Sequence, residues 1–507
     1  METKGLRLAE LLTALSVVTD LGIGRPPETA MRACILASRL AAEMGLSNAE
    51  ASHAYYATLL RYIGCTAYAH EEASMAGGDE LAARAVTTRL DFGNLQEVSE
   101  AYQQLIPGPP PSPQVVQAFV QVPQDLVVSH CEVGISLAHR LSMDASVQAA
   151  LGQIFERWDG HGIPHRLHGE DLCLPVRFAH VATQVMAFLP DGYDTVRMII
   201  RQRSGGWFDP AIADAFLRRG KDLVSEVEEA DAWRAAVEAE PAPEQRVADS
   251  ALDEVGGVFA DLTDLKCHFT LGHSRGVAEL AEGAARRAGL PPADIQTLHR
   301  AALFHDLGRV GIPNGVWEKA GPLSAIDWEA VRLHPYHTER ILSRAPALQS
   351  LALIAGMHHE RENGSGYFRG AGAPSLSPAV RLLCAADAYQ AMTQDRPHRR
   401  AMAPDAAART LEAEVQAGRL DADAVRHVLV AAGHAVARSR AGGPAGLSGR
   451  ELEVLRLIAT GSSYRDVASV LVISPRTAAH HVQHIYNKIG VSTRAAAALY
   501  AMEHRLL

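Results

Sequence analysis

The stretch LFHDLGRVGIPNGVWEKAGPLSAIDWEAVRLHPYHTERIL, residues 303–342, decides the fold class of this 507-residue chain. The pair His305-Asp306 ends one apolar helical pattern, and His334 lies inside the next. Apolar residues recur at intervals of three and four here and along most of the chain, which is typical of amphipathic helices. No run of alternating apolar and polar residues predicts a sheet, so we expect an all-α fold.

Outward from this stretch, residue types that bind metals stand at five places. His273 precedes it, and MHHERENGSGYFRG (357–370) and SPAVRLLCAADAYQAMT (377–393) follow it. The seven candidate ligands are His273, His305, Asp306, His334, His358, His359 and Asp387. Imidazole and carboxylate suit iron, manganese, zinc or nickel. Two metals about 3.5–4 Å apart can clamp the attacking and leaving oxygens of a phosphoester, so the pattern predicts a two-metal phosphohydrolase site.

A single histidine, or one His-Asp pair, is weak evidence for a metal. The chain has 23 histidines, and a surface or hydrogen-bonded role is the more frequent one for any of them. We interpret His268, His299 and His337 in that way. The order, spacing and helical context of the seven candidates agree with one another, so the set as a whole predicts metal binding.

The quoted segments resemble the HD-GYP subgroup of the HD-domain phosphohydrolases over nearly all of 268–400. The resemblance implies an all-helical domain that hydrolyses a nucleotide phosphoester, such as cyclic di-GMP, with two divalent ions, iron or manganese. By position, one metal is held by His273, His305, Asp306 and Asp387, and the second by His334, His358, His359 and the bridging Asp306. Phe269 stands where some members have a glutamate for a third metal, so we expect two.

The resemblance also assigns the substrate phosphate to Arg309, Tyr367, Arg396 and Arg399, and catalysis to Asp306 and Arg309. Arg309 replaces the family's lysine, keeps the positive charge and can bind phosphate through two parallel hydrogen bonds. The family's Gly-Tyr-Pro tripeptide reads Gly-Tyr-Phe at 366–368, and Asn363 stands where an aspartate is usual. These departures leave the metal chemistry in place and leave the substrate open.

The sequence also predicts three domains. Ala-, Pro- and Gly-rich linkers near 238–246 and 437–446 divide the chain into 1–237, 247–436 and 447–507. The first two segments are diverged copies, because LLRYIGC (59–65) aligns with LFHDLGR (303–309) and FERWDGHGIP (155–164) with HERENGSGYF (359–368). The seven ligands face Thr29, Arg61, Tyr62, His130, Ile154, Phe155 and Thr183 in the first copy. We therefore expect a degenerate first lobe that binds no catalytic metal.

Composition excludes some classes of protein. The chain has no apolar run long enough for a membrane span, and its six cysteines (34, 65, 131, 173, 267 and 384) are scattered, as expected for free thiols in a reducing cytoplasm. From Leu447 onward seven basic and four acidic side chains give +3, which leaves −13 for the rest of a chain of net charge −10. A basic end on an acidic body is compatible with nucleic-acid binding.

Residues 447–507 predict four short helices and resemble the LuxR-type helix-turn-helix domain over their whole length. In the third helix, Ala478, Val482, Ile485 and Ile489 share one face. This places Arg476, Thr477, His480, Gln483, His484 and Lys488 outward, as candidates for contact with double-stranded DNA. The alternative is a small helical cap used for dimerisation.

Three hypotheses follow. The first is a cytoplasmic, homodimeric transcription regulator whose body is an HD-GYP-like binuclear phosphodiesterase. The second is a catalytically weak or inactive regulator that senses a nucleotide or cyclic dinucleotide at the metal site. The third is a plain hydrolase in which the DNA-binding domain plays no part.

Overall fold

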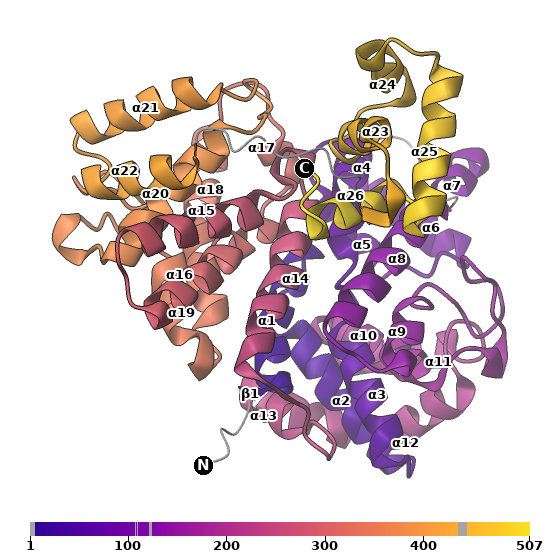
Figure 1. The fold of residues 1–507 in the computed structure, drawn as a ribbon. Helices are drawn as coiled ribbons and strands as arrows, with labels where there is room; N and C mark the ends of the chain where they lie inside the picture. The colour runs from indigo at the N-terminus through magenta and orange to yellow at the C-terminus, as the bar shows by residue number, and fades with distance from the viewer. Residues whose placement is uncertain (1–5, 107, 109, 121–123, 434–443) are drawn as a thin grey trace. The chain divides into compact units, whose positions relative to one another are not determined.

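The computed structural model describes residues 6–106, 108, 110–120, 124–433 and 444–507, and these residues are almost entirely helical (Figure 1). The all-α prediction is confirmed. The only sheet in the described ranges pairs β1 (Leu6–Arg7) with β2 (Arg246–Val247) in antiparallel fashion. In those ranges no helix is both long and apolar enough to cross a bilayer.

The chain divides into two compact units, Met1–Ala251 and Leu252–Leu507. The segment that we predicted as a linker at 238–246 packs within the first unit. There Glu240, 6% exposed, accepts a hydrogen bond from Arg7 Nε at 2.6 Å. Most of the second predicted linker, 437–446, lies outside the described residues.

Thirteen helices are described in the first unit. They are α1 (Leu8–Gly22), α2 (Thr29–Glu43), α3 (Asn48–Leu59), α4 (Ala69–Met75), α5 (Glu80–Thr87), α6 (Leu95–Leu105), α7 (Pro113–Val120), α8 (Gln124–Arg140), α9 (Ala145–Leu151), α10 (Leu174–Phe188), α11 (Tyr193–Arg203), α12 (Pro210–Glu229) and α13 (Ala232–Glu238).

The second unit begins with nine helices that form the HD-like part. They are α14 (Leu252–Leu265), α15 (His273–Arg287), α16 (Pro292–Phe304), α17 (Asn314–Trp317), α18 (Ala325–Leu342), α19 (Gln349–Ala355), α20 (Pro378–Met392), α21 (Pro404–Gln416) and α22 (Ala422–Ala431). Small buried residues such as Ala278, Ala281 and Ala285 let α15 pack closely against α16 and α20.

The repeat seen in the sequence extends to the secondary structure. α2 and α15 coincide residue for residue at an offset of 244, and α9 and α10 coincide with α19 and α20 at an offset of 204. Supporting contacts repeat as well: Arg177 pairs with Asp209 in the first unit, and Arg381 with Asp421 in the second. The difference in residue number between equivalent positions falls by 40, from 244 to 204, along the chain. The reason is that the first unit has additional residues between α3 and α8, including α4, α5 and α6.

The last four helices are α23 (Gly449–Ala459), α24 (Tyr464–Leu471), α25 (Pro475–Ile489) and α26 (Arg494–Glu503). Ser474 caps α25 by accepting a hydrogen bond from the Thr477 N–H, and Pro475 occupies the first turn. The four short helices that the sequence predicts for 447–507 are present. Ala478, Val482 and Ile485 are buried, whereas Ile489 is only partly so.

Candidate metal centre

Three of the candidate histidines of the second unit lie at or near the ends of helices. His305 follows the last residue of α16, His273 opens α15, and His358 lies three residues beyond the end of α19. The last carbonyls of a helix have no partner within that helix. His305 Nδ1 lies 2.7 Å from Ala302 O and His358 Nδ1 lies 2.7 Å from Ala355 O, so each ring donates from Nδ1 and turns Nε2 inward.

His334 achieves the same orientation inside a helix. Pro335, the next residue of α18, has no N–H and cannot bond the carbonyl of Val331 four residues earlier. His334 Nδ1 lies 2.6 Å from that carbonyl, which leaves Nε2 free to face the other ligands. The proline thus helps to orient a candidate ligand.

The seven predicted ligands converge. Three groups of side chains bring their ligand atoms within 4.8 Å of one another: His273, His305 and Asp387; His305, Asp306 and His358; and His334, His358 and His359. Six of the seven are buried, and His359 is about one-fifth exposed at its side chain. Each of the seven predicted ligands belongs to at least one of these three groups.

Asp306 stands between the two histidine sets. Its Oδ1 lies 3.3 Å from His334 Nε2 and 3.5 Å from His358 Nε2. Its Oδ2 lies 3.5 Å from His305 Nε2 and 3.8 Å from His273 Nε2. One oxygen for each set is the arrangement that a carboxylate bridging two metals requires.

Asp387 completes the first set. Its Oδ1 lies 3.1 Å from His273 Nε2 and 3.9 Å from His305 Nε2, and its Oδ2 lies 3.7 Å from His359 Nδ1. The other ring nitrogen of His273 is 2.9 Å from Gln394 Oε1. Gln394 is therefore a supporting residue that the sequence did not reveal.

The protonation states suit divalent cations. Burial lowers the pKa of His273 and His305, and it lowers the pKa of His359 further, so these imidazoles are neutral near pH 7. Burial alone would raise the pKa of Asp306, but Arg309 and the surrounding histidines outweigh it and hold that pKa well below its usual range. Neutral imidazoles around ionised carboxylates are the forms that bind metals.

An unpartnered buried atom supports the fit. His305 Nε2 is fully buried and has no hydrogen-bond partner, although it points at the two carboxylates. Buried polar atoms without partners are infrequent in proteins. A cation shared with Asp306 and Asp387 would satisfy this nitrogen, so the donor set fits a divalent metal ion at this position.

Two of the four predicted phosphate-binding residues lie close to the ligand cluster. Arg309 Nη1 lies 2.9 Å from Asp306 Oδ2, and its guanidinium is stacked 4.0 Å from the centre of the Trp317 ring. The Tyr367 ring centre is 4.7 Å from that of His359. Burial, chiefly, raises the pKa of Tyr367, so its phenol keeps its proton and can donate to an anion.

The other two predicted phosphate ligands differ from each other. Arg396 makes one long bond, 3.4 Å, to Phe269 O, and its guanidinium is near enough to Arg309 for the two charges to interact. Arg399 instead donates to Ala391 O at 2.6 Å and to Met392 O at 2.9 Å, the last carbonyls of α20. The structure therefore brings Arg396 toward the cluster and uses Arg399 to end a helix.

A buried glutamate shapes the Gly-Tyr-Phe loop. Glu360, 0% exposed, accepts hydrogen bonds from Arg369 N and Ala371 N, both at 2.8 Å. In the first unit Glu156 accepts from His165 N at 2.6 Å and Leu167 N at 3.0 Å, the same positions of the repeat. Comparison of the two copies could have found this glutamate from the sequence.

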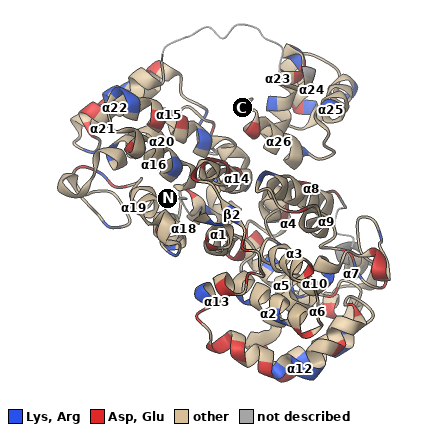
Figure 2. Cartoon of the chain, turned by 60° about the horizontal axis from the view of Figure 1, so that its bottom comes forward, with Lys and Arg blue, Asp and Glu red and all other residues tan. Residues whose placement is uncertain are grey.

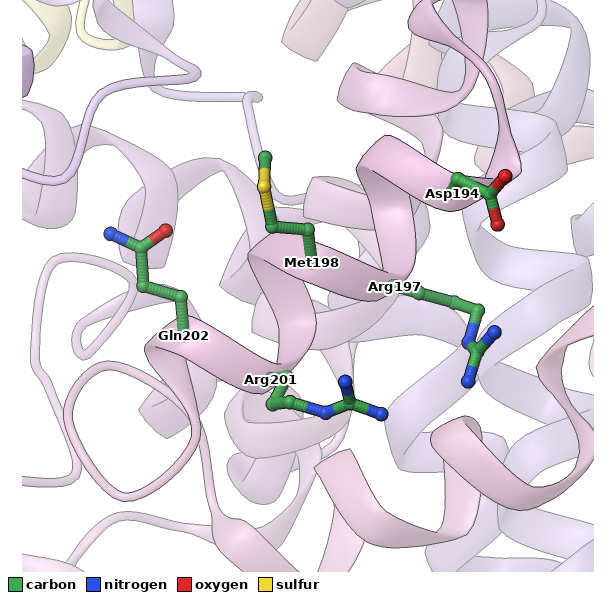
Figure 3. A pocket seen from close by; sticks show the side chains of 5 residues that line it. All are labelled: Asp194, Arg197, Met198, Arg201 and Gln202. Atoms are coloured by element: carbon green, nitrogen blue, oxygen red, sulfur yellow. The ribbon is translucent and has the colours of Figure 1, made fainter.

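A separate hollow in the first unit lies along one face of α11, lined by Asp194, Arg197, Met198, Arg201 and Gln202 (Figure 3). All five come from a single exposed helix, and none is among the predicted ligands. This hollow lacks the convergent polar groups of an active site.

The candidate DNA-binding residues lie on α25, which carries no acidic residue (Figure 2). Arg476, Thr477, His480, Gln483 and His484 are exposed. Lys488 Nζ lies 2.7 Å from Glu451 Oε2, so its ammonium ties α25 to α23 within the domain.

Comparison with known proteins agrees with this geometry. Residues 257–424 match the family model described as HD domain, and residues 445–501 match that of bacterial regulatory proteins of the luxR family. The chain combines an HD domain with a luxR-family domain.

Relatives of the HD part are cyclic-dinucleotide phosphodiesterases. The chain is 28% identical, over 80% of its length and 90% of the relative's, to the 3′3′-cGAMP-specific phosphodiesterase 3 of Vibrio cholerae. It is 32% identical over 31% of its length to a cyclic di-GMP phosphodiesterase of Thermotoga maritima, of which 43% is covered. The crystal structure of a cyclic GMP-AMP-specific phosphodiesterase of V. cholerae matches with a TM-score of 0.59, 25% identity, and coverage of 84% of this chain and 98% of that one.

Proposed function

We propose that the chain is a DNA-binding regulator whose HD domain hydrolyses a 3′,3′-cyclic dinucleotide with two divalent metal ions, iron or manganese. The observation that carries the proposal is Asp306, which directs one oxygen to each of two histidine sets. The relatives act on 3′3′-cGAMP or cyclic di-GMP, and both contain the 3′,5′-phosphodiester that such a site would hydrolyse.

Two divalent ions in such a site polarise the phosphodiester and lower the pKa of a water that attacks it. The protein's own residues do the rest. Arg309, whose Cζ lies 4.0 Å from the centre of the Trp317 ring, would bind a non-bridging phosphate oxygen, and Arg396 would add a second positive charge. The protonated Tyr367 hydroxyl would donate a hydrogen bond to the same phosphate.

Asp306 and Arg309 are therefore the proposed catalytic residues. The proposed metal ligands are His273, His305, Asp306 and Asp387 for one ion and His334, His358 and His359, with Asp306, for the other. The domain limits 1–237, 247–436 and 447–507 remain part of the proposal, with a homodimer that would place two α25 helices on two half-sites.

A matched pair of variants tests the metal assignment. His334→Ala and His130→Ala each remove a buried histidine at the same position of the repeat. We expect His334→Ala to lose at least one metal ion per chain in elemental analysis of anaerobically purified protein, together with hydrolysis of 3′3′-cGAMP and cyclic di-GMP. His130→Ala should keep both. Equal metal content in the two variants would refute the assignment.

A sensing function without turnover is the second candidate. The non-catalytic first lobe favours it, and so do Asn363 and Phe368, because each of these two replaces a residue usual in the resembled family. A metal-loaded protein that binds a cyclic dinucleotide tightly, yet forms no linear product at stoichiometric enzyme, would support this candidate over hydrolysis.

A further inference from the structure

At the positions equivalent to the candidate metal centre, the first unit lacks the acidic side chains and has basic ones. Both carboxylates of the second unit are lost, since Thr183 stands for Asp387 and Tyr62 for Asp306. A guanidinium is added, since Arg61 stands for His305, and Arg25 stands for Phe269 at the same offset of 244. A site built in this way repels metal cations and attracts anions.

Arg61 is a buried cation with spare donors. Its residue is 4% exposed, and Nη2 donates to Ile154 O at 3.1 Å. Nε and Nη1 are buried and have no hydrogen-bond partner. No carboxylate of the described residues forms an ion pair with it. A buried charge without a partner is strongly unfavourable, so these two donors point to an anion.

The groups around Arg61 do not neutralise it. His130 Nε2 contacts the Arg61 carbonyl at 3.3 Å, and burial lowers the pKa of His130 to about 3, so this ring is uncharged. Burial likewise lowers the pKa of His180 well below its usual value. The Tyr62 ring centre lies 5.5 Å from Arg61 Cζ, and this side chain carries no carboxylate.

Arg25 adds a second cation beside Tyr62. The two are close enough to interact electrostatically, and within the described part of the chain the Arg25 guanidinium has one hydrogen bond, from Nη2 to Thr88 Oγ1 at 2.7 Å. Asp20 also interacts with Arg25, but its Oδ1 accepts from Ala30 N at 3.0 Å. Burial raises the pKa of Asp20 well above its usual value, so this carboxyl is a poor counter-ion.

The additional residues of the first unit cover this region. Gln184 Nε2, one position after Thr183, donates to Thr88 O at 2.8 Å. Arg203 Nη2 donates to Arg89 O at 2.9 Å. The segment after α5 is therefore tied to α10 and α11, and its Thr88 side chain bonds Arg25.

We propose that the first unit contains a phosphate-binding site centred on Arg61, with Arg25 as its second cation. The Nε and Nη1 donors of Arg61 lie on different edges of the guanidinium, so each can donate separately to an oxygen of a bound anion. The ligand class is a phosphate group, either free or carried by a nucleotide. The site is distinct from the metal centre and does not depend on the proposed hydrolysis.

Full-length protein, stripped of metal with a chelator, is titrated calorimetrically with inorganic phosphate and with AMP at constant ionic strength. Wild type and Arg61→Met share the second unit, so their difference isolates the first. We expect Arg61→Met to weaken one binding event at least about tenfold. Arg219→Met, which removes an exposed arginine from the same unit, should leave that event unchanged. Equal affinity for both probes indicates free phosphate as ligand, and tighter AMP binding indicates a nucleotide.

Phosphate binding that is identical in wild type and Arg61→Met would overturn the proposal, as would a wild type that binds phosphate no better than chloride. Far-UV circular dichroism checks folding. If Arg61→Met does not fold, Arg61→Lys keeps the charge and removes the guanidinium donors, and Arg25→Met removes the second cation. Unchanged phosphate affinity in both of these variants would equally refute the site.

Discussion

Glu360 and Glu156 support equivalent loops in the second and first units. Substituting each in turn therefore tests whether the loop of the HD domain supports catalysis. Each carboxylate is 0% exposed and accepts two backbone N–H groups of the loop that follows it. Truncation to alanine removes the acceptor of two hydrogen bonds, at about 1–3 kcal/mol each, so each variant should lose about 2–6 kcal/mol of stability. The two losses should be similar because the contacts are similar.

The catalytic effects should differ. The Glu360 loop carries Tyr367, whose N–H bonds His359 O at 3.2 Å, whereas the Glu156 loop carries no candidate ligand. Loosening the support of a metal ligand typically costs about 10–100-fold in affinity or activity. We therefore expect Glu360→Ala to lower kcat/KM per bound metal by at least about tenfold, and Glu156→Ala to leave it nearly unchanged.

The assay is steady-state hydrolysis of a 3′,3′-cyclic dinucleotide and of bis(p-nitrophenyl) phosphate at saturating manganese, below the unfolding temperature of both variants. Urea titration measures the stability losses. An equal fall in kcat/KM for both variants would show that loop support acts only through global stability. Full activity of a folded Glu360→Ala protein would refute the link between this loop and the metal centre.

Three further outcomes are expected. Asp264→Ala should weaken the metal bound by His273, in chelator competition, by about tenfold or more, because Asp264 bonds the first turn of α15 through Ser274 N at 2.7 Å. Glu451→Gln should destabilise the luxR-family domain at pH 7, as read by hydrogen exchange in α23. The bond from Lys488, above all, lowers the pKa of Glu451 from 4.5 to about 2, so the difference from wild type should persist above pH 4.5 and vanish as the pH falls to about 2. Arg476→Ala should weaken DNA binding and reduce the slope of log K against log salt by about one in filter binding, whereas an unchanged slope would exclude a phosphate contact.

The candidate ligands could be chosen from the sequence because they are histidines and aspartates at or near the ends of predicted helices or on their buried faces. His305-Asp306 follows a helix whose apolar spacing is visible, and Asp387 lies on the buried face of another. The helices of the luxR-family domain were equally predictable, since Ser474-Pro475 marks the start of α25.

The supporting residues were not predictable from one copy alone. Gln394 meets His273 across 121 positions of sequence, and Trp317 lies under Arg309 only because α17 turns back toward the cluster. Lys488 has the residue type and position of a phosphate contact, yet it meets Glu451 from 37 residues away. Such pairs are set by tertiary packing, which local periodicity does not encode.

Comparison of the two copies distinguishes residues that support the fold from residues that form the candidate metal centre. Asp264 holds the start of α15 in the second unit, and Asp20 bonds the Ala30 N–H at the start of α2 in the first. The loop glutamates and the Arg–Asp pairs repeat in the same way, although the ligand sets differ entirely in charge. These supports involve none of the candidate metal ligands, so substitution of a ligand leaves them in place. Loss of activity in a metal-ligand variant that stays folded therefore reports on the chemistry of the centre, and a variant such as His334→Ala is a fair test of it.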